Sequence, residues 1–232
     1  MKIGFDVLGD LNLSPGEEFN WENKATSLYC VIPGNISSDI KTIIKVLLHL
    51  SKFYQGVFYS TGALEYEGVE LKHQRTAEII KACKKIRNVA VLFQNVVIID
   101  GIAILGCNGW FMDVTDKTET EEIASRLFQL EDLKYIVNSI EKLQKHLDVK
   151  KIVVVTGSVP DVELFFGEKP NTIETQLSLN IALLSDTQHK ISHWAFGSHK
   201  KIVDITKDNI NYLNNPYCKG NPYWAKRFEV EV

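Results

Sequence analysis

Five short polar loops hold the residues of this sequence that could bind a metal ion. They read GDLNL (9–13), PGNISSD (33–39), STGALEYEG (60–68), TGSVPD (156–161) and HWAFGSHKK (193–201). Their carboxylate and imidazole groups are potential ligands, and Asn is a legitimate oxygen ligand for hard cations. The same residues also have ordinary structural uses, because Asp and Asn after a strand commonly stabilise turns.

Strands are predicted immediately before these loops. Short β-branched or aromatic runs indicate buried strands at 3–8, 28–32, 57–60, 96–99, 102–106 and 152–156, and SHWAF (192–196) reads as a further strand. In an α/β sheet the loops after the carboxyl ends of strands form the ligand crevice. We therefore expect the five loops to lie along one edge of the fold.

Long amphipathic runs alternate with the strands and predict helices. A Ser38/Asp39 cap precedes apolar residues at helical spacing from Ile40 to Leu50, which indicates a βαβ crossover helix. Further helices are expected at 70–86, 120–147 and 173–184, and the tail from Lys201 reads as short strands and turns. The sequence has no linker composition and no internal repeat, so we expect one α/β domain spanning 1–232.

In this order and spacing, the five loops resemble the motifs of the calcineurin-like metallophosphoesterase family. Those motifs read DxH, GDxx(D/N), GNH(D/E), a strand ending in a His, and GHxH. The resemblance covers nearly the whole chain, including IIDGIAILGCNGW (98–110) and the Trp194 that precedes the fifth motif. It implies an α/β sandwich of two mixed β-sheets flanked by helices. The family uses two metal ions to generate a hydroxide nucleophile and to stabilise charge on a phosphoryl group.

Most of the family's ligand positions are changed here. Asp10 matches the Asp of the first motif and Glu65 the acidic end of the third, whereas Asn35 replaces the metal-bridging Asp and Lys200 adds a positive charge. Losing one ligand or its support commonly costs about 10–100-fold in affinity or activity. The residues expected to line a vestigial pocket are Asp10, Asn12, Asn35, Ala63, Leu64, Glu65, Gly157, Ser198, His199 and Lys200.

The resemblance and these changes together imply a catalytically inactive metallophosphoesterase-like protein without metal or other cofactor. Such a pseudoenzyme would act as a binding, structural or assembly component. The alternative is a weakly active phosphoesterase of the phosphodiesterase or nuclease type. It would hold one divalent cation, such as Mn²⁺ or Mg²⁺, through Asp10, Asn12, Asn35, Glu65 and His199. His199 taken alone reads as a solvent-facing loop imidazole.

A binding role directs attention to the surface, and the tail segment NPYCKGNPYWAKRF (215–228) is the first candidate. Its aromatic residues Tyr217, Tyr223 and Trp224 are of the types enriched at interfaces, which favours a protein partner or self-association. The competing interpretation is that the tail packs on the protein's own core.

Composition sets the remaining expectations. The net charge of −3 argues against an electrostatically driven nucleic-acid binder, although Lys84, Lys85 and Arg87 and similar pairs could follow a phosphate backbone. No apolar run is long enough to span a membrane, so we expect no membrane association and a cytoplasmic location. The family's distribution suggests a bacterial or phage protein; a viral one would act in the virion or the infected host's cytoplasm.

The four cysteines fit neither a zinc site nor a disulfide framework and are expected to be buried thiols.

Overall fold

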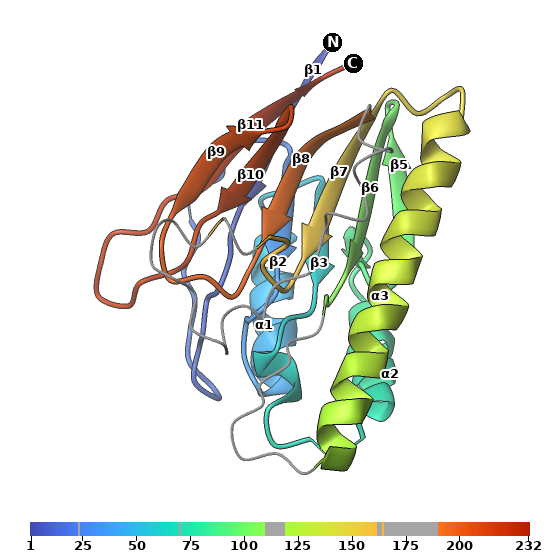
Figure 1. Ribbon diagram of the computed structural model, residues 1–232. Coiled ribbons are helices and arrows are strands. Elements are labelled where there is room, and N and C mark those ends of the chain that lie inside the picture. The colour runs from blue at the N-terminus through green and yellow to red at the C-terminus, as the bar shows by residue number, and fades with distance from the viewer. Residues whose placement is uncertain (23, 70, 110–118, 162–163, 165–189) are drawn as a thin grey trace.

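Two mixed β-sheets packed face to face form the centre of the computed structural model (Figure 1). The structure describes residues 1–22, 24–69, 71–109, 119–161, 164 and 190–232. The first sheet has the order β11-β1-β2-β3-β4 and the second β5-β6-β7-β8-β10-β9. The expected two-sheet α/β sandwich is therefore confirmed.

The first sheet is parallel except at one edge, where β11 pairs antiparallel with β1. Its strands are β1 (Lys2–Val7), β2 (Tyr29–Pro33), β3 (Gly56–Ser60), β4 (Val89–Val91) and β11 (Lys226–Glu231). In the second sheet, the antiparallel strands β5 and β9 lie at the two edges of a parallel centre. Its strands are β5 (Asn95–Ile99), β6 (Ile102–Cys107), β7 (Lys151–Thr156), β8 (Ile191–Phe196), β9 (Val203–Lys207) and β10 (Ile210–Asn214).

Helices cover the outer face of each sheet. α1 (Ile40–Leu50) and α2 (Lys72–Cys83) lie against the five-stranded sheet, and α3 (Glu119–Lys145) lies along the outside of the six-stranded sheet (Figure 1). A short 3₁₀ helix, η1 (Leu64–Tyr66), follows β3. The Asp39 carboxylate caps α1 by accepting from the Thr42 N–H at 2.9 Å, as the sequence predicts.

Three apolar layers hold the sandwich together. Between the sheets lie Phe5, Val31 and Phe58 from one side and Ile104 and Val153 from the other. The outer layers pack α1 and α2 on the first sheet, through residues such as Leu47 and Ile79, and α3 on the second, through Ile136 and Ile140. Since each sheet is covered on both faces, its central strands are continuous apolar runs, which is why the sequence identified them.

The predicted elements agree with the structure to within a few residues. The helix expected at 70–86 begins at Lys72 and ends at Cys83, and the one expected at 120–147 runs from Glu119 to Lys145. The helix expected at 173–184 lies outside the described residues. The sequence analysis missed β4, because three residues are too few to show a strand pattern.

The cysteines are only partly as expected. Cys30, Cys83 and Cys107 are buried free thiols, whereas Cys218 is free but exposed, so the expectation of burial was wrong for Cys218. Within the described residues, no helix combines the length and apolar character needed to cross a membrane.

Candidate functional site

The five motif loops meet at the carboxyl edge of both sheets. Backbone hydrogen bonds join the first loop to the second, from the Asn12 N–H to the Asn35 carbonyl at 2.8 Å, and the fifth to β7, from the Gly197 N–H to the Thr156 carbonyl at 3.0 Å. Asp10, Asn12, Asn35 and Ser198 all have left-handed backbones, with φ between 47° and 62°. This region is sparsely populated by non-glycine residues, so the surrounding contacts must hold these four tips in place.

Asp10 is the centre of the cluster. Its side chain is 4% exposed. Atom Oδ1 accepts hydrogen bonds from Asn35 Nδ2 at 2.6 Å and from the Ser198 N–H at 2.8 Å. Atom Oδ2 accepts from the His199 N–H at 3.2 Å. One carboxylate therefore ties the first loop to the second and the fifth.

The amide of Asn35 is oriented by contacts on both of its sides. Asn35 Oδ1 accepts from the Leu64 N–H at 3.0 Å, and Nδ2 donates to Asp10 and to Ser198 Oγ at 2.9 Å. Ser198 Oγ in turn donates to the Gly157 carbonyl at 2.6 Å. The amide thus presents its NH₂ group, which has no lone pair for a metal, toward Asp10. Through these bonds the chain of contacts extends to all five loops.

Two glycines allow the loops to approach this closely. A Cβ at Gly157 would collide with the Thr61 carbonyl oxygen and with Gly62, and a Cβ at Gly62 would collide with the side chain of Asn35. Gly157 stands where the resemblance places a metal-binding His. The space that this imidazole would need is therefore taken by the backbone of the third loop.

Glu65 belongs to a second, fully satisfied group beside the first. Its carboxylate is buried and accepts from the N–H groups of Asn35, Ile36 and Gly62 at 2.7–3.1 Å and from the Tyr59 hydroxyl at 2.9 Å. The three N–H donors join the second and third loops, and Tyr59 adds a donor from β3. Glu65 thus stabilises the backbone of these loops, and both of its carboxylate oxygens are already engaged in hydrogen bonds.

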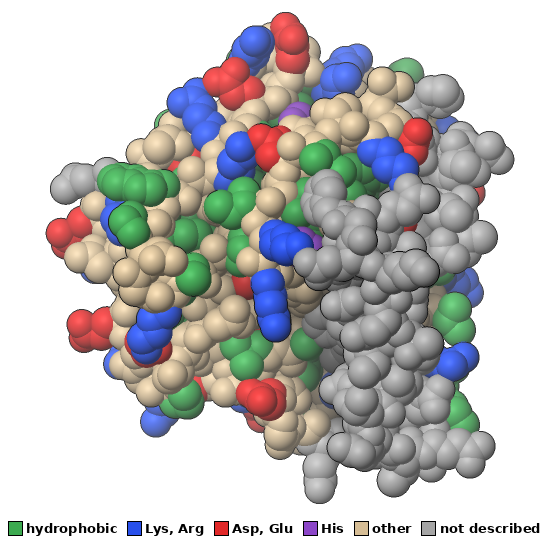
Figure 2. Space-filling model, turned by 60° about the vertical axis from the view of Figure 1, so that its left-hand side comes forward, with side chains coloured by type: hydrophobic (Ala, Val, Ile, Leu, Met, Phe, Trp, Pro, Cys, Tyr) green, Lys and Arg blue, Asp and Glu red, His purple; other side chains and the backbone are tan. Residues whose placement is uncertain are grey.

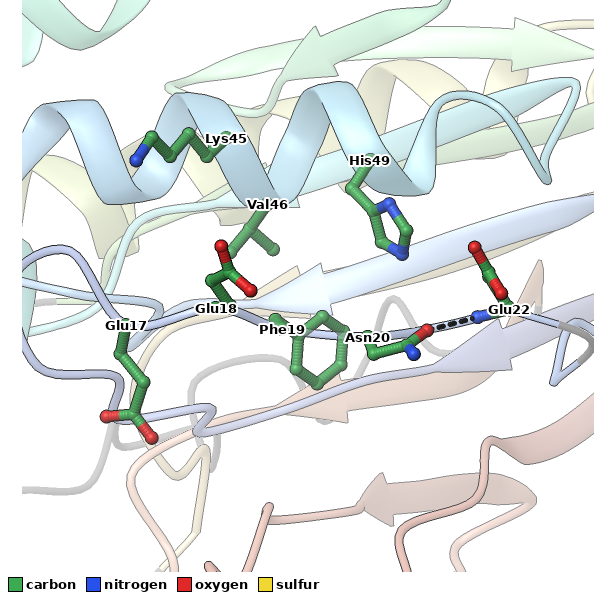
Figure 3. Close-up of a pocket in the computed structure, with 8 residues that line it drawn as sticks. All are labelled: Glu17, Glu18, Phe19, Asn20, Glu22, Lys45, Val46 and His49. Atoms are coloured by element: carbon green, nitrogen blue, oxygen red, sulfur yellow. Dashed lines mark hydrogen bonds between the residues drawn. The ribbon is translucent and has the colours of Figure 1, made fainter.

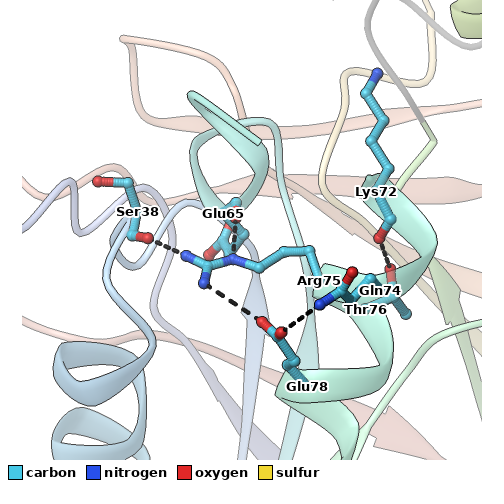
Figure 4. A network of polar contacts seen from close by, with 7 residues as sticks. All are labelled: Ser38, Glu65, Lys72, Gln74, Arg75, Thr76 and Glu78. Atoms are coloured by element: carbon cyan, nitrogen blue, oxygen red, sulfur yellow. Dashed lines mark hydrogen bonds and ion pairs between the residues drawn. The ribbon is translucent and has the colours of Figure 1, made fainter. Parts of the chain in front are cut away.

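Arg75 on α2 closes this group from outside (Figure 4). Its Nε donates to the Glu65 backbone carbonyl at 2.9 Å, its Nη2 donates to the Ser38 carbonyl, and its Nη1 pairs with Glu78 at 4.0 Å. One guanidinium therefore links α2 to the second and third loops. The sequence analysis missed this role, since an Arg inside a predicted helix gives no signal of what it contacts.

Burial dominates the electrostatics of the cluster. Desolvation raises the pKa of Asp10 to about 6, although its hydrogen bonds with Ser198, Asn35 and His199 oppose the shift. The pKa of Glu65 is raised for the same reason, against the effect of its backbone and Tyr59 donors. A carboxylate that ligated a metal would be held ionised by the cation's charge.

The remaining predicted pocket residues differ in exposure. Asn12 is exposed and donates from Nδ2 to the Asp10 backbone carbonyl at 2.9 Å; Lys200 is exposed, and Ala63 and Leu64 are half-buried. The expectation of a solvent-facing His199 was wrong. Its side chain is 7% exposed, packs edge-on against Phe196, and has Nδ1 3.0 Å from the Lys201 carbonyl oxygen.

The tail aromatics lie in different environments. Tyr223 is buried, donates to the Asn215 carbonyl at 2.7 Å and packs against Trp21, so it belongs to the core of the first sheet. Tyr217 is half-buried beside Tyr223, with ring centroids 5.2 Å apart. Trp224 is 63% exposed, with the Lys24 ammonium 5.7 Å from its ring centroid. Of the three, Trp224 offers a surface to a partner.

A cavity of about 290 Å³ among the described residues lies apart from the motif loops (Figure 3). Its lining is formed by Glu17, Glu18, Phe19, Asn20 and Glu22 together with Lys45, Val46 and His49 of α1. None of these residues belongs to the five loops. On the side of the molecule that Figure 2 shows, acidic and basic side chains are interspersed and hydrophobic ones form only small groups.

Comparisons with known proteins give the fold a context. No family model and no curated protein sequence matches the chain. Among solved structures, a phosphopantetheinyl hydrolase from Mycobacterium tuberculosis superimposes with a TM-score of 0.67 at 11% identity, over 97% of this chain and 95% of that one. A proposed 5′-nucleotidase from Staphylococcus aureus gives a TM-score of 0.57 at 12% identity, over 100% of this chain and 51% of that one. The chain thus has the α/β sandwich fold of these phosphoesterase-type hydrolases.

Proposed function

We propose that this protein is a catalytically inactive metallophosphoesterase-like protein in which direct hydrogen bonds between the motif loops take the place of metal ions. It acts as a binding, structural or assembly component. The observation that carries the proposal is the Asp10 cluster. In the described part of the chain, the donors that reach the Asp10 carboxylate are N–H groups of Asn35, Ser198 and His199, so the positive ends of these N–H dipoles lie where a cation would otherwise balance its charge.

The donor set at this edge also does not fit two divalent cations. Asn35 directs an NH₂ group toward Asp10, and Glu65 is fully engaged with backbone N–H groups. Within the described part of the chain, no group of three or more His, Cys, Asp or Glu side chains is arranged to hold a metal ion. Two dications need several anionic or imidazole ligands to offset their mutual repulsion.

The second candidate is a weakly active, one-metal phosphoesterase. The closeness of Asp10, Asn35 and His199 favours it, because rotation of one amide would turn an oxygen toward Asp10. That rotation would bring the NH₂ group of Asn35 against the Leu64 N–H, which now donates to Asn35 Oδ1. Two facing donors without acceptors are unfavourable in a buried site, so the inactive form is the better supported of the two.

Metal analysis and thermal unfolding test the proposal directly. Protein purified without chelator should contain no stoichiometric Mn, Mg, Fe or Zn. Millimolar Mn²⁺ should leave the melting temperature unchanged, because a ligand stabilises only a state that it binds. The same samples should not hydrolyse a bis-aryl phosphate. Stoichiometric metal, or turnover that Asp10→Ala abolishes and Trp224→Ala preserves, would establish the one-metal enzyme instead.

A further inference from the structure

His49, in the last turn of α1, is hydrogen-bonded to the neighbouring segment of residues 17–22. Its Nε2 accepts from the Trp21 backbone N–H at 2.9 Å. In the described part of the chain, this is the one hydrogen bond that joins residues 17–22 to α1. The next one toward the N-terminus runs from the Gly16 N–H to Thr42 Oγ1 at 2.7 Å. The cavity of about 290 Å³ is lined by the same two elements (Figure 3).

The hydrogen bond from Trp21 determines the protonation state of His49. An imidazole nitrogen accepts only when it carries no proton, so Nε2 is unprotonated and the proton of the neutral ring is on Nδ1. The imidazolium form has no free lone pair and can only donate at this position. Trp21 is fully buried, so its N–H would then be a buried donor that faces another donor, which is unfavourable.

Charged groups around His49 offer the protonated ring a different partner. These groups are Glu17, Glu18 and Glu22 on the segment, Lys45 of α1 and Lys52 beyond its end. Burial, together with Lys52, lowers the pKa of His49, whereas the Glu22 carboxylate opposes them. The Glu17 carboxylate already pairs with the Lys219 ammonium at 2.8 Å. Glu22 is therefore the carboxylate that can compensate a positive charge on His49.

We propose that His49 is a pH-sensitive switch of the contact between α1 and residues 17–22. The neutral ring holds the Trp21 N–H. The protonated ring releases it and turns toward the Glu22 carboxylate, so that residues 17–20 separate from α1 and the cavity opens. Gly16 is the hinge, since it has a φ of 79° and open space beside it. The Trp21 indole stays in the core, where its Nε1 donates to the Tyr54 hydroxyl at 2.8 Å.

Linkage gives the direction of the switch. Because the fold favours neutral His49, the contribution of this contact to stability is fully present above about pH 6.5, the ordinary pKa of His, and is lost as the pH falls through the lower pKa of the folded state. The raised pKa of Asp10 acts on global stability in the opposite direction, so a local measurement is needed. His49 and its contacts lie outside the motif loops, and the inference therefore goes beyond the proposed function and can fail independently of it.

Amide hydrogen exchange of the full chain, followed by NMR and corrected for intrinsic rates, tests the switch. Between pH 8 and pH 5 the protection of the Trp21 N–H should fall at least about 5-fold in the wild type. It should fall equally in His146→Gln, which replaces an exposed histidine. In His49→Gln it should not depend on pH, because an amide oxygen accepts without titrating. Constant protection in the wild type, or an equal fall in His49→Gln, would overturn the inference.

Nitrogen-15 NMR of the histidine rings tests the two partners of His49. At pH 8 its Nε2 should be the unprotonated nitrogen. Glu22→Gln should lower the pH midpoint of His49 by about 0.3 unit or more, because it removes the carboxylate that stabilises the charged ring. Glu17→Gln is the matched control and should shift the midpoint less, since Glu17 is paired with Lys219. A proton on Nε2 at pH 8, or equal midpoints in the wild type and Glu22→Gln, would refute the switch.

Discussion

Asp10 and Asp132 are two buried aspartates with nearly the same environment and different consequences. Their exposed fractions are 4% and 0%, and desolvation raises the pKa of each to about 6. Asp10 accepts hydrogen bonds from two backbone N–H groups and the Asn35 amide, and Asp132 accepts from the Gly109 N–H and the Gln94 amide. Asp10 lies among the motif loops at the carboxyl edge of the sheets, whereas Asp132 on α3 binds Gln94 and Gly109, which flank the β5–β6 hairpin.

The two sites differ in the freedom of the amide partner. Gln94 is exposed, and its Nε2 reaches Asp132 Oδ1 at 2.8 Å, so this amide can turn and present its oxygen to residue 132 instead of its NH₂ group. Asn35 is buried and is held by the Leu64 N–H on one side and by Asp10 and Ser198 on the other. A buried carboxylate with a raised pKa thus occurs in this fold without any metal motif. What distinguishes Asp10 is the rigid network that encloses it.

The largest expected effect comes from placing a histidine at Gly157, beside Asp10, where the resembled family has one. Gly157→His should destabilise the protein by about 3 kcal/mol or more, because its Cβ collides with backbone that cannot move without separating the loops. Asn12→His is the matched control, since it introduces the histidine of the resembled first motif at an exposed position and should cost less than about 1 kcal/mol. Urea unfolding of both variants measures the difference. Equal stabilities would show that the loops can open to admit an imidazole.

The pH dependence of stability should be the same at the two aspartates. Both folded-state pKa values lie near 6, above the value of about 4 in an unfolded chain. The folded protein therefore binds the proton more tightly, and each group contributes stability that is fully present below about pH 4 and is lost as the pH rises through 6.

Replacing either carboxyl with an amide removes that titration. Between pH 4 and pH 7, the unfolding free energy of the wild type should fall by about 2–3 kcal/mol more than that of Asp132→Asn. The difference between the wild type and Asp10→Asn over this range should be the same. Chemical unfolding of the three proteins across this range measures both slopes. A flat profile for Asp10 alone would mean that its carboxylate is ionised throughout, as a bound cation would make it.

The smallest effect is the difference between the two amide variants at pH 8. Asp132→Asn should be neutral or stabilising, because Gln94 can turn its carbonyl oxygen toward the new NH₂ group. Asp10→Asn should be less stable than Asp132→Asn by about 1–2 kcal/mol, since its NH₂ group must face the His199 N–H while Asn35 cannot turn. Indistinguishable stabilities would mean that the Asn35 network is not rigid.

Strands, helices and the grouping of the motif loops could be predicted because they depend on local pattern and on strand direction. The run from Ile152 to Thr156 is apolar since both of its faces are buried, and Asp39 caps α1 because Thr42 follows at the right spacing. The resemblance also located Asp10 and Asn35 at one edge. Predicting these features does not require knowing which side chains contact one another in the folded protein.

The contacts that close the site could not be predicted. The amide orientation of Asn35 depends on the Leu64 N–H, and the role of Gly157 depends on the distance between two loops that are far apart in sequence. The same limit explains the errors at His199 and Cys218, whose burial is decided by tertiary packing. Tyr223 shows it too, because an aromatic residue in a tail has the same sequence signal whether it is buried or exposed.

The pairing of β1 with β11 has a consequence for how quickly this chain folds. The two strands are in register from Lys2 with Glu231 to Val7 with Lys226, and the rings of Phe5 and Phe228 stack with centroids 5.1 Å apart. The strand that leads into Asp10 is thus completed by the most distant segment of the sequence. Loop closure over such separations is entropically costly before any contact is gained, and topologies of this kind fold in about milliseconds to seconds. During that delay β1 has an unpaired edge, and such an edge can pair with a strand of another molecule in competition with correct folding.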